Sequence, residues 1–362
     1  MQYKRMWTLR KEMIVALAGV CLSYGTTTQA ASIDIAAKPV SVQTSEQSLP
    51  TGKETASKQA AWEAFWQGLL NSRVVPDDYT KTVKTSGAIE RTYLSDGPHK
   101  TARQSLQTQK PMEQYEIYYP VDLLEKKVAC PAVIFLNGSG VPASRYPALF
   151  EHLASWGFIA IGNEDPSTGT GQSADTTVAK LLELNEDAHS RFFHQIDTAR
   201  IGITGHSQGG AGVFNAITSQ PHHALYRTAV ALSPANERLS EALHWTYDLT
   251  KVQCPIFLLS GTKGDFELKL VLPPKDLQSM YAKISGPKVM ARRKDTEHGQ
   301  MLYEADGYVT AWLRWQLYGD KRAAKAFSGK NPEIRTNCLY RDVKIQGRTS
   351  HLRINTPSHS SK

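Results

Sequence analysis

A serine flanked by glycines stands near the middle of the chain, where residues 205–209 read GHSQG and fit the pattern Gly-x-Ser-x-Gly. The preceding RIGIT alternates as a strand does, and the following GAGVFNAIT has the apolar spacing of a helix. A tight turn from strand to helix lifts a serine hydroxyl above the sheet edge, and flanking glycines prevent clashes at that corner. The helix N-terminus adds positive potential where negative charge would develop. The motif therefore favours Ser207 as a nucleophile over a structural Gly-rich turn.

A serine nucleophile needs a base, and the base needs an acid that orients it. In sheets with such a corner these residues follow in the chain order serine, acid, histidine. Asp265 comes just after the apolar run CPIFLLS, and sites in open α/β sheets collect at the C-terminal ends of strands. His298 lies in KDTEHGQM, after the next strand. We predict Asp265 as the acid and His298 as the base, with a turn carboxylate and a surface histidine as the alternatives.

Other titratable residues fit these two roles less well. Asp295 and Glu297 are too close to His298 in sequence to hold its ring from behind. Asp248 precedes its strand, which would put it at the opposite sheet edge. His206 stands on the corner itself, so we expect its side chain to point away from the serine hydroxyl.

An oxyanion hole requires two backbone N–H donors. One is the residue after the nucleophile, here Gln208, and the second comes from the loop after an earlier strand. The strand PAVIFL is followed by NGSG at 137–140, whose backbone can approach a substrate closely. We predict the N–H of Ser139 as the second donor, with Gly140 as the alternative.

Strand and helix patterns alternate from about residue 88. The β-rich runs are Tyr115–Tyr119, Ala132–Leu136, Ile159–Gly162, Ile201–Thr204, Ala229–Leu232, Ile256–Leu259 and Val289–Arg292. Helical patterns include Arg145–Trp156, Asp175–Asn185, Gly210–Thr218, Asp276–Lys283 and Tyr308–Leu317. Continuous apolar strands suit a parallel sheet covered on both faces. The alternation predicts an α/β fold with a doubly wound, mostly parallel sheet.

Two connecting segments bear on access to the site. Residues 233–253 lie where a lid domain would be inserted, and they are too few for a large one. The Gly- and Ser-rich loop Ser167–Ala174 follows the fourth strand at the edge expected to hold the site, so it is a candidate for substrate contact. We therefore expect an open cleft without a large lid domain.

The ends of the chain differ from the middle. Residues 1–30 combine a basic start, an apolar run and small residues at Thr28 and Ala30, which predicts a signal peptide cleaved after Ala30. We expect a flexible linker at 31–58, an N-terminal helix and first strand region at 59–110, a core at 111–330 and a basic tail at 331–362. The aromatic residues of the helix expected at 60–70 are explained by docking onto the core.

Composition restricts the classes of function. The chain is 41% hydrophobic and 21% charged, which is typical of a globular protein, and its formal charge of +8 is no evidence for nucleic-acid binding. After cleavage it keeps Cys130, Cys254 and Cys338, an odd number, so at least one thiol is unpaired or bonds another chain. No Cys/His cluster suggests a metal, and no later apolar run has transmembrane length.

Together these features resemble the α/β-hydrolase superfamily, over roughly residues 115–329. The resemblance is carried by NGSG, HLASWGFIAIGNED, RIGITGHSQGGAG, GTKGD and EHGQM. Within the superfamily the sequence is most similar to the branch of dienelactone hydrolase-like enzymes and bacterial cutinase-like polyester hydrolases. The resemblance implies a nucleophile, an acid, a base and two oxyanion N–H donors at Ser207, Asp265, His298, Ser139 and Gln208.

The sequence also departs from that branch. Ser139 and His206 stand where aromatic residues are common, and SPANERLS lacks the tryptophan expected of aromatic-polyester hydrolases. Cys338 resembles one half of a C-terminal disulfide, but AFSGKNP offers no partner, which leaves pairing with Cys254 or no bond. The resemblance therefore carries over the triad and not the specificity for aromatic polyesters.

We expect an exported serine hydrolase, secreted or periplasmic, that cleaves carboxylic esters through an acyl-enzyme. Its substrate would be a small or polymeric ester, with no metal or organic cofactor, no nucleic-acid partner and no stable membrane anchor. The alternatives are an amidase or peptidase with the same triad, and a non-catalytic exported binding protein on a hydrolase scaffold.

Overall fold

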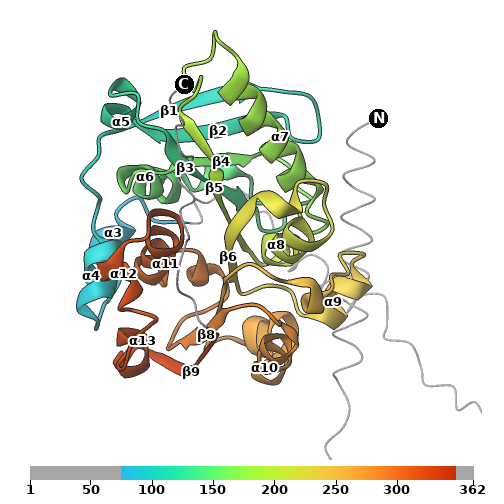
Figure 1. Ribbon diagram of the computed structural model, residues 1–362. Helices are drawn as coiled ribbons and strands as arrows, with labels where there is room; N and C mark the ends of the chain where they lie inside the picture. The colour runs from blue at the N-terminus through green and yellow to red at the C-terminus, as the bar shows by residue number, and fades with distance from the viewer. Residues whose placement is uncertain (1–74, 348–362) are drawn as a thin grey trace, which may run out of the picture. The chain divides into compact units, whose positions relative to one another are not determined.

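A single nine-stranded sheet forms the centre of the fold in the computed structural model, which describes residues 75–347 (Figure 1). The strand order is β1-β2-β4-β3-β5-β6-β7-β8-β9. The strands are β1 (Thr101–Gln107), β2 (Gln114–Pro120), β3 (Cys130–Leu136), β4 (Ile159–Asn163), β5 (Ile196–His206), β6 (Tyr226–Leu232), β7 (Ile256–Gly261), β8 (Lys288–Arg293) and β9 (Tyr340–Gln346). The expected signal peptide, the linker and the helix at 60–70 lie outside the described residues.

The middle of the sheet is parallel and its edges are antiparallel. Neighbouring strands from β4 through β8 pair in parallel, whereas β1, β2 and β9 pair antiparallel. Every residue of β3, β4, β7 and β8 is buried. Strands buried on both faces are apolar along their whole length, which explains the continuous apolar runs PAVIFL and CPIFLLS.

Helices cover both faces of the sheet. On one face α6 (Pro147–Ser155) packs on β2 and β4, and α11 (Asp306–Tyr318) packs on β5 and β6. On the other face α7 (Gln172–Glu186) and α8 (Gln208–Thr218) pack on β3 and β5 (Figure 1). The other α-helices of the described residues are α3 (Tyr79–Thr82), α4 (Ala88–Leu94), α5 (Val121–Glu125), α9 (Glu237–Ala242), α10 (Pro274–Lys283), α12 (Lys321–Ala324) and α13 (Glu333–Thr336). The prediction of a doubly wound, mostly parallel α/β fold is confirmed.

The segment between β6 and β7 is short, as expected. It contains α9 and the 3-10 turn η3 (Leu249–Lys251), and no inserted domain. The described part of the chain therefore has no large lid over the C-terminal ends of these strands.

The C-terminal segment differs from the prediction of a basic tail at 331–362. Its first part is integrated into the fold, because α13 and β9 lie within it and β9 pairs with β8. Tyr340 is buried at 5% exposure and its ring stacks under Arg293. The sequence hid this strand because β9 is an edge strand with an alternating, half-exposed pattern, and its Lys and Arg residues face solvent.

Candidate active site

Ser207 occupies the corner between β5 and α8. Its backbone has φ 60° and ψ −117°, a conformation that non-glycine residues rarely adopt. A Cβ on Gly205 would lie 2.4 Å from the carbonyl oxygen of Gly209, and a Cβ on Gly209 would lie 2.1 Å from that of Leu136. Glycine is therefore required on both sides of the serine, because the turning backbone packs against itself and against the end of β3.

His298 follows β8 on a loop that returns to this corner. Its Nδ1 lies 2.7 Å from Oε2 of Glu267, and the two side chains are 13% and 0% exposed. Glu267 belongs to η4 (Phe266–Val271), a single π-helical turn that follows β7. Such turns are uncommon and are found frequently at functional sites.

The carboxylate of Glu267 is fully hydrogen-bonded despite its burial. Its second oxygen accepts from the Ser233 hydroxyl at 2.7 Å and from the Gly261 N–H at 2.9 Å. Burial by itself would raise the pKa of Glu267, but the hydrogen bond and charge of His298, together with these donors, lower it. The group is therefore an ionised carboxylate held against the imidazole.

The predicted acid, Asp265, is not brought to His298. Its side chain is 80% exposed and forms a 2.8 Å ion pair with Lys269. Asp265 precedes the π-helical turn and faces solvent, whereas Glu267, two positions later in the same segment, contacts the histidine. The segment DFELKL carries both acids, and its pattern does not show which of them faces inward.

His206 packs against the histidine loop. Its ring lies 4.5 Å, centroid to centroid, from the ring of His298, and its Nε2 lies 2.8 Å from the carbonyl oxygen of that residue. A carbonyl only accepts, so Nε2 of His206 carries the proton. Burial, followed by the nearby charge of His298, lowers the pKa of His206 to about 3. A neutral ring thus links the corner to the histidine loop, an arrangement that the sequence analysis missed.

The loop after β3 lies beside the corner. A Cβ on Gly138 would be 3.8 Å from Cβ of Ser207. Asn137 anchors this loop, because its side-chain nitrogen donates to the carbonyls of Asn163 and Asp165. The next predicted donor, Ser139, has its hydroxyl 2.6 Å from the side-chain amide of Gln208.

Gln208 is the first residue of α8 and is 1% exposed. The first N–H groups of a helix have no acceptor within the helix, so this position suits a donor to a bound oxyanion. Ser139 and Gln208 are therefore joined beside Ser207, and His298 is tied to the same corner through His206. Glu267 takes the place next to the histidine that was predicted for Asp265.

Metal ligands and disulfides do not contribute to this site in the part of the chain that the structure describes. Within residues 75–347, no three side chains of the ligating types converge in a group that could hold an ion. Cys130, Cys254 and Cys338 are all free thiols, so the pairing of Cys254 with Cys338 is not formed. None of the helices between 75 and 347 has the length and hydropathy that a bilayer crossing requires.

One comparison with known proteins identifies a family. A family model described as "PETase: PET hydrolase-like" matches residues 84–266, about half of the chain. The matched region includes Ser139 and the Ser207 corner and ends one residue before Glu267, so Glu267 and His298 follow it. No curated protein matches the sequence.

Proposed function

The chain belongs to the PET hydrolase-like family of α/β hydrolases, a family that acts on esters, and on this premise we propose that it is a serine hydrolase that cleaves carboxylic esters through an acyl-enzyme. The observation that carries the proposal is the buried Glu267–His298 pair beside a serine on a strained strand-to-helix corner. A nucleophile, a base and an orienting acid are the parts that acyl transfer needs.

The proposed reaction follows from the hydrogen bond that His298 makes with Glu267. Glu267 binds Nδ1 of His298, so this nitrogen carries a proton and Nε2 is left as the base. Nε2 removes the proton of the Ser207 hydroxyl as the oxygen attacks the ester carbonyl. The ionised Glu267 stabilises the imidazolium that forms, and the imidazolium then protonates the leaving alcohol. Water repeats these steps on the acyl-enzyme and releases the carboxylic acid.

The negative charge of the tetrahedral intermediate also needs stabilisation. We assign this role to the N–H groups of Gln208 and Ser139, at the start of α8 and in the loop beside the corner. The dipole of α8 adds positive potential at the same point. Losing one such donor typically costs about 3 kcal/mol of transition-state stabilisation.

The proposed substrate is a polymeric or small carboxylic ester. The family description supports polyesters. Within residues 75–347, the short α9 and η3 segment between β6 and β7 adds no domain-sized cover over the strand ends that would exclude a long chain. We further propose that residues 1–30 direct export and are removed, because a polymer is degraded outside the cytoplasm.

Ester turnover by matched serine variants tests the proposal. Hydrolysis of p-nitrophenyl esters with acyl chains from two to twelve carbons, and release of soluble products from a polyester film, would be measured for the wild type, Ser207→Ala and Ser219→Ala. Ser219 caps the other end of α8 and serves as the control. We expect only Ser207→Ala to abolish turnover. A wild type inactive on every ester, or residual turnover equal in both variants, would overturn the proposal.

A further inference from the structure

We propose that the side chains of Ser139 and Gln208 form a hydrogen-bonded bridge that holds the two oxyanion donors in register, so that both act as positioning residues beyond their backbone roles. The inference rests on the proposed function, because it assigns a purpose to side chains whose main chains are the proposed donors. The contacts on which it rests do not involve His298 or Glu267, because they join two loops and the first turn of α8.

The bridge is short and protected. Oγ of Ser139 lies 2.6 Å from the side-chain amide of Gln208, a distance typical of a strong hydrogen bond. Gln208 is 1% exposed, and glutamine is seldom buried so completely unless its amide is satisfied. The two residues are 69 positions apart in sequence, so the contact joins the loop after β3 to the first turn of α8.

The other end of the same amide reaches a second loop, the one after β4. When the Gln208 nitrogen faces Ser139, its oxygen accepts from the N–H groups of Thr168 and Gly169 at 2.6 and 3.3 Å. This orientation pairs donors with acceptors throughout. In the opposite orientation the amide donates to the Pro166 carbonyl at 3.3 Å, and the 2.6 Å contact with Ser139 remains.

A further hydrogen bond joins the two loops directly. The hydroxyl of Thr168 donates to the carbonyl of Asn137 at 2.7 Å, which ties the loop after β4 back to the loop that carries Ser139. Asn137, Thr168 and Gln208 are each 1% exposed. Buried polar networks with every member satisfied are rigid, and their members support one another.

Rigidity at this place has a catalytic consequence. Oxyanion donors are effective because they already point at the position of the developing charge and need no reorganisation. Gln208 is fixed by its helix, but Ser139 lies in a loop of small residues, NGSG, which backbone hydrogen bonds of a sheet or helix do not hold. The bridge supplies that constraint, and a small displacement of a positioned group can reduce the rate substantially.

A second glutamine, just after the same helix, provides the matched control. The side chain of Gln220, just beyond the end of α8, donates to the carbonyl of Thr170 at 2.7 Å, in the same loop after β4. Gln220 is distant in sequence from the NGSG loop and half-buried. Replacing it with methionine removes a glutamine contact to that loop without touching the bridge.

The experiment is a double-mutant cycle on ester turnover. Kinetic constants would be measured for the wild type, Ser139→Ala, Gln208→Met, the double variant and Gln220→Met, together with inhibition by an alkyl boronic acid that mimics the tetrahedral intermediate. We expect each bridge variant to lower kcat and boronate affinity about tenfold with KM little changed, because one hydrogen bond is lost. The double variant should be no more than about twofold worse than the poorer single variant, because the two changes remove the same interaction. Gln220→Met should match the wild type.

Two further measurements separate positioning from a structural role and from failure of the proposed function. Ser139→Thr keeps the hydroxyl and should restore most of the kcat lost in Ser139→Ala. Amide hydrogen exchange at 138–141 should be faster in Ser139→Ala and unchanged in Gln220→Met. This measurement tests the bridge independently of enzyme activity. Multiplicative losses in the double variant, or unchanged exchange, would overturn the bridge. A wild type without Ser207-dependent turnover would overturn the proposed function, and the exchange result would still decide the bridge.

Discussion

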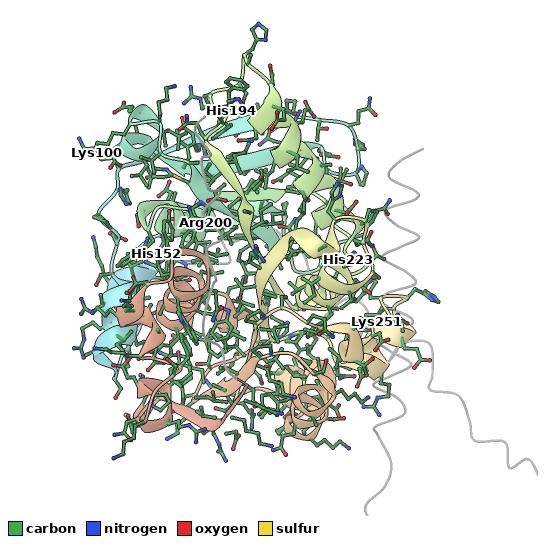
Figure 2. The ribbon with its side chains drawn as sticks, viewed as in Figure 1. Lys100, His152, His194, Arg200, His223 and Lys251 are labelled. Carbon is green, nitrogen blue, oxygen red and sulfur yellow. The ribbon has the colours of Figure 1, made fainter. Side chains whose placement is uncertain are left out.

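Two histidine–carboxylate pairs in this protein have the same distance between Nδ1 and a carboxylate oxygen and differ in their surroundings. Nδ1 of His298 lies 2.7 Å from Glu267, and Nδ1 of His152 lies 2.7 Å from Asp306. The first pair lies beside the Ser207 corner with its histidine 13% exposed. The second is sealed between α6 and α11, where His152 is 1% exposed and is labelled in Figure 2.

The two imidazoles differ in what their second nitrogen meets. Nε2 of His152 lies 3.1 Å from the carbonyl oxygen of Ser95, so both of its nitrogens face acceptors and both carry protons. Burial disfavours a charged ring, but the charge and hydrogen bond of Asp306 and the Ser95 carbonyl raise the pKa of His152. The Tyr79 hydroxyl donates to the same carboxylate at 2.7 Å. His152 is thus a structural cation that ties α3 to the core.

The comparison teaches that a histidine–carboxylate pair alone does not make a base. At His298 the main-chain carbonyl, and not the ring, takes the hydrogen bond from His206, so only Nδ1 of the ring is committed to the carboxylate pair. The second ring nitrogen, Nε2, is the one to which the proposed reaction assigns the role of base. At His152 the fold uses both nitrogens, which excludes proton exchange with a substrate.

The largest effect should come from Glu267→Gln compared with Asp265→Asn. Glutamine keeps the shape of Glu267 but removes the charge that orients and stabilises the His298 imidazolium. We expect kcat for a soluble ester to fall about 10³- to 10⁴-fold, as is typical when the triad acid is made neutral. Asp265→Asn should stay within about twofold of wild type, because Asp265 is exposed and pairs with Lys269. The reverse ranking would restore Asp265 as the acid.

The comparison of Asp265 with Glu267 also shows which parts of the site could be predicted from the sequence. The corner around Ser207 is encoded locally, because the glycine pattern and the strand–helix switch are read within fifteen residues. His298 followed from chain order. The choice between Asp265 and Glu267 depends on a π-helical turn, whose single inserted residue changes which side chain faces inward, and no periodicity in six residues reports that.

The fold, too, was predictable where a local sequence pattern encodes it and not where it depends on distant contacts. Every predicted core strand is present, because buried parallel strands are continuously apolar. β9 was missed because an edge strand has no such run. The roles of His152 and His206 were hidden because they depend on contacts between residues far apart in the chain, 154 and 92 positions in the two cases, and composition near each histidine gives no indication of its partner.

Removing the charge of Asp306 should affect stability and leave catalysis intact. Asp306→Asn leaves a buried imidazolium without its counter-charge, which typically costs about 3–5 kcal/mol of unfolding free energy. Urea denaturation would measure the loss, and kcat of the folded protein should stay within about twofold of wild type. A large fall in kcat at unchanged stability would show that this pair, too, takes part in the reaction.

A smaller effect should follow from cutting the link between the corner and the histidine loop. His206→Phe keeps a flat ring against His298 but removes the donor to its carbonyl, whereas His206→Asn keeps an N–H donor in a smaller side chain. We expect kcat to fall about tenfold in His206→Phe, because one buried hydrogen bond is lost, and less in His206→Asn. Equal losses in the two variants would show that ring packing, and not the hydrogen bond, positions the loop.

The most subtle difference lies in how the buried histidines respond to pH, and the two should have opposite signs. The pKa of His206 is lowered to about 3 by burial and by His298, with Glu267 acting weakly the other way, so the stability that His206 contributes is present above about 6.5 and is lost as pH falls toward 3. The pKa of His152 is raised by Asp306 and the Ser95 carbonyl, and by Asp96, so its contribution is complete below about 6.5 and is lost as pH rises through the folded-state pKa.

Difference curves isolate these two contributions from every other titration. Unfolding free energy would be measured from pH 4 to pH 9 for the wild type, His206→Phe and His152→Gln. The wild type should lose its advantage over His206→Phe on acidification and its advantage over His152→Gln on alkalinisation, each with a slope of at most about 1.4 kcal/mol per pH unit. Parallel curves would contradict both assignments, because a buried ring between two acceptors carries both protons, whereas the buried His206 ring donates from Nε2 to a carbonyl and is kept neutral by its burial.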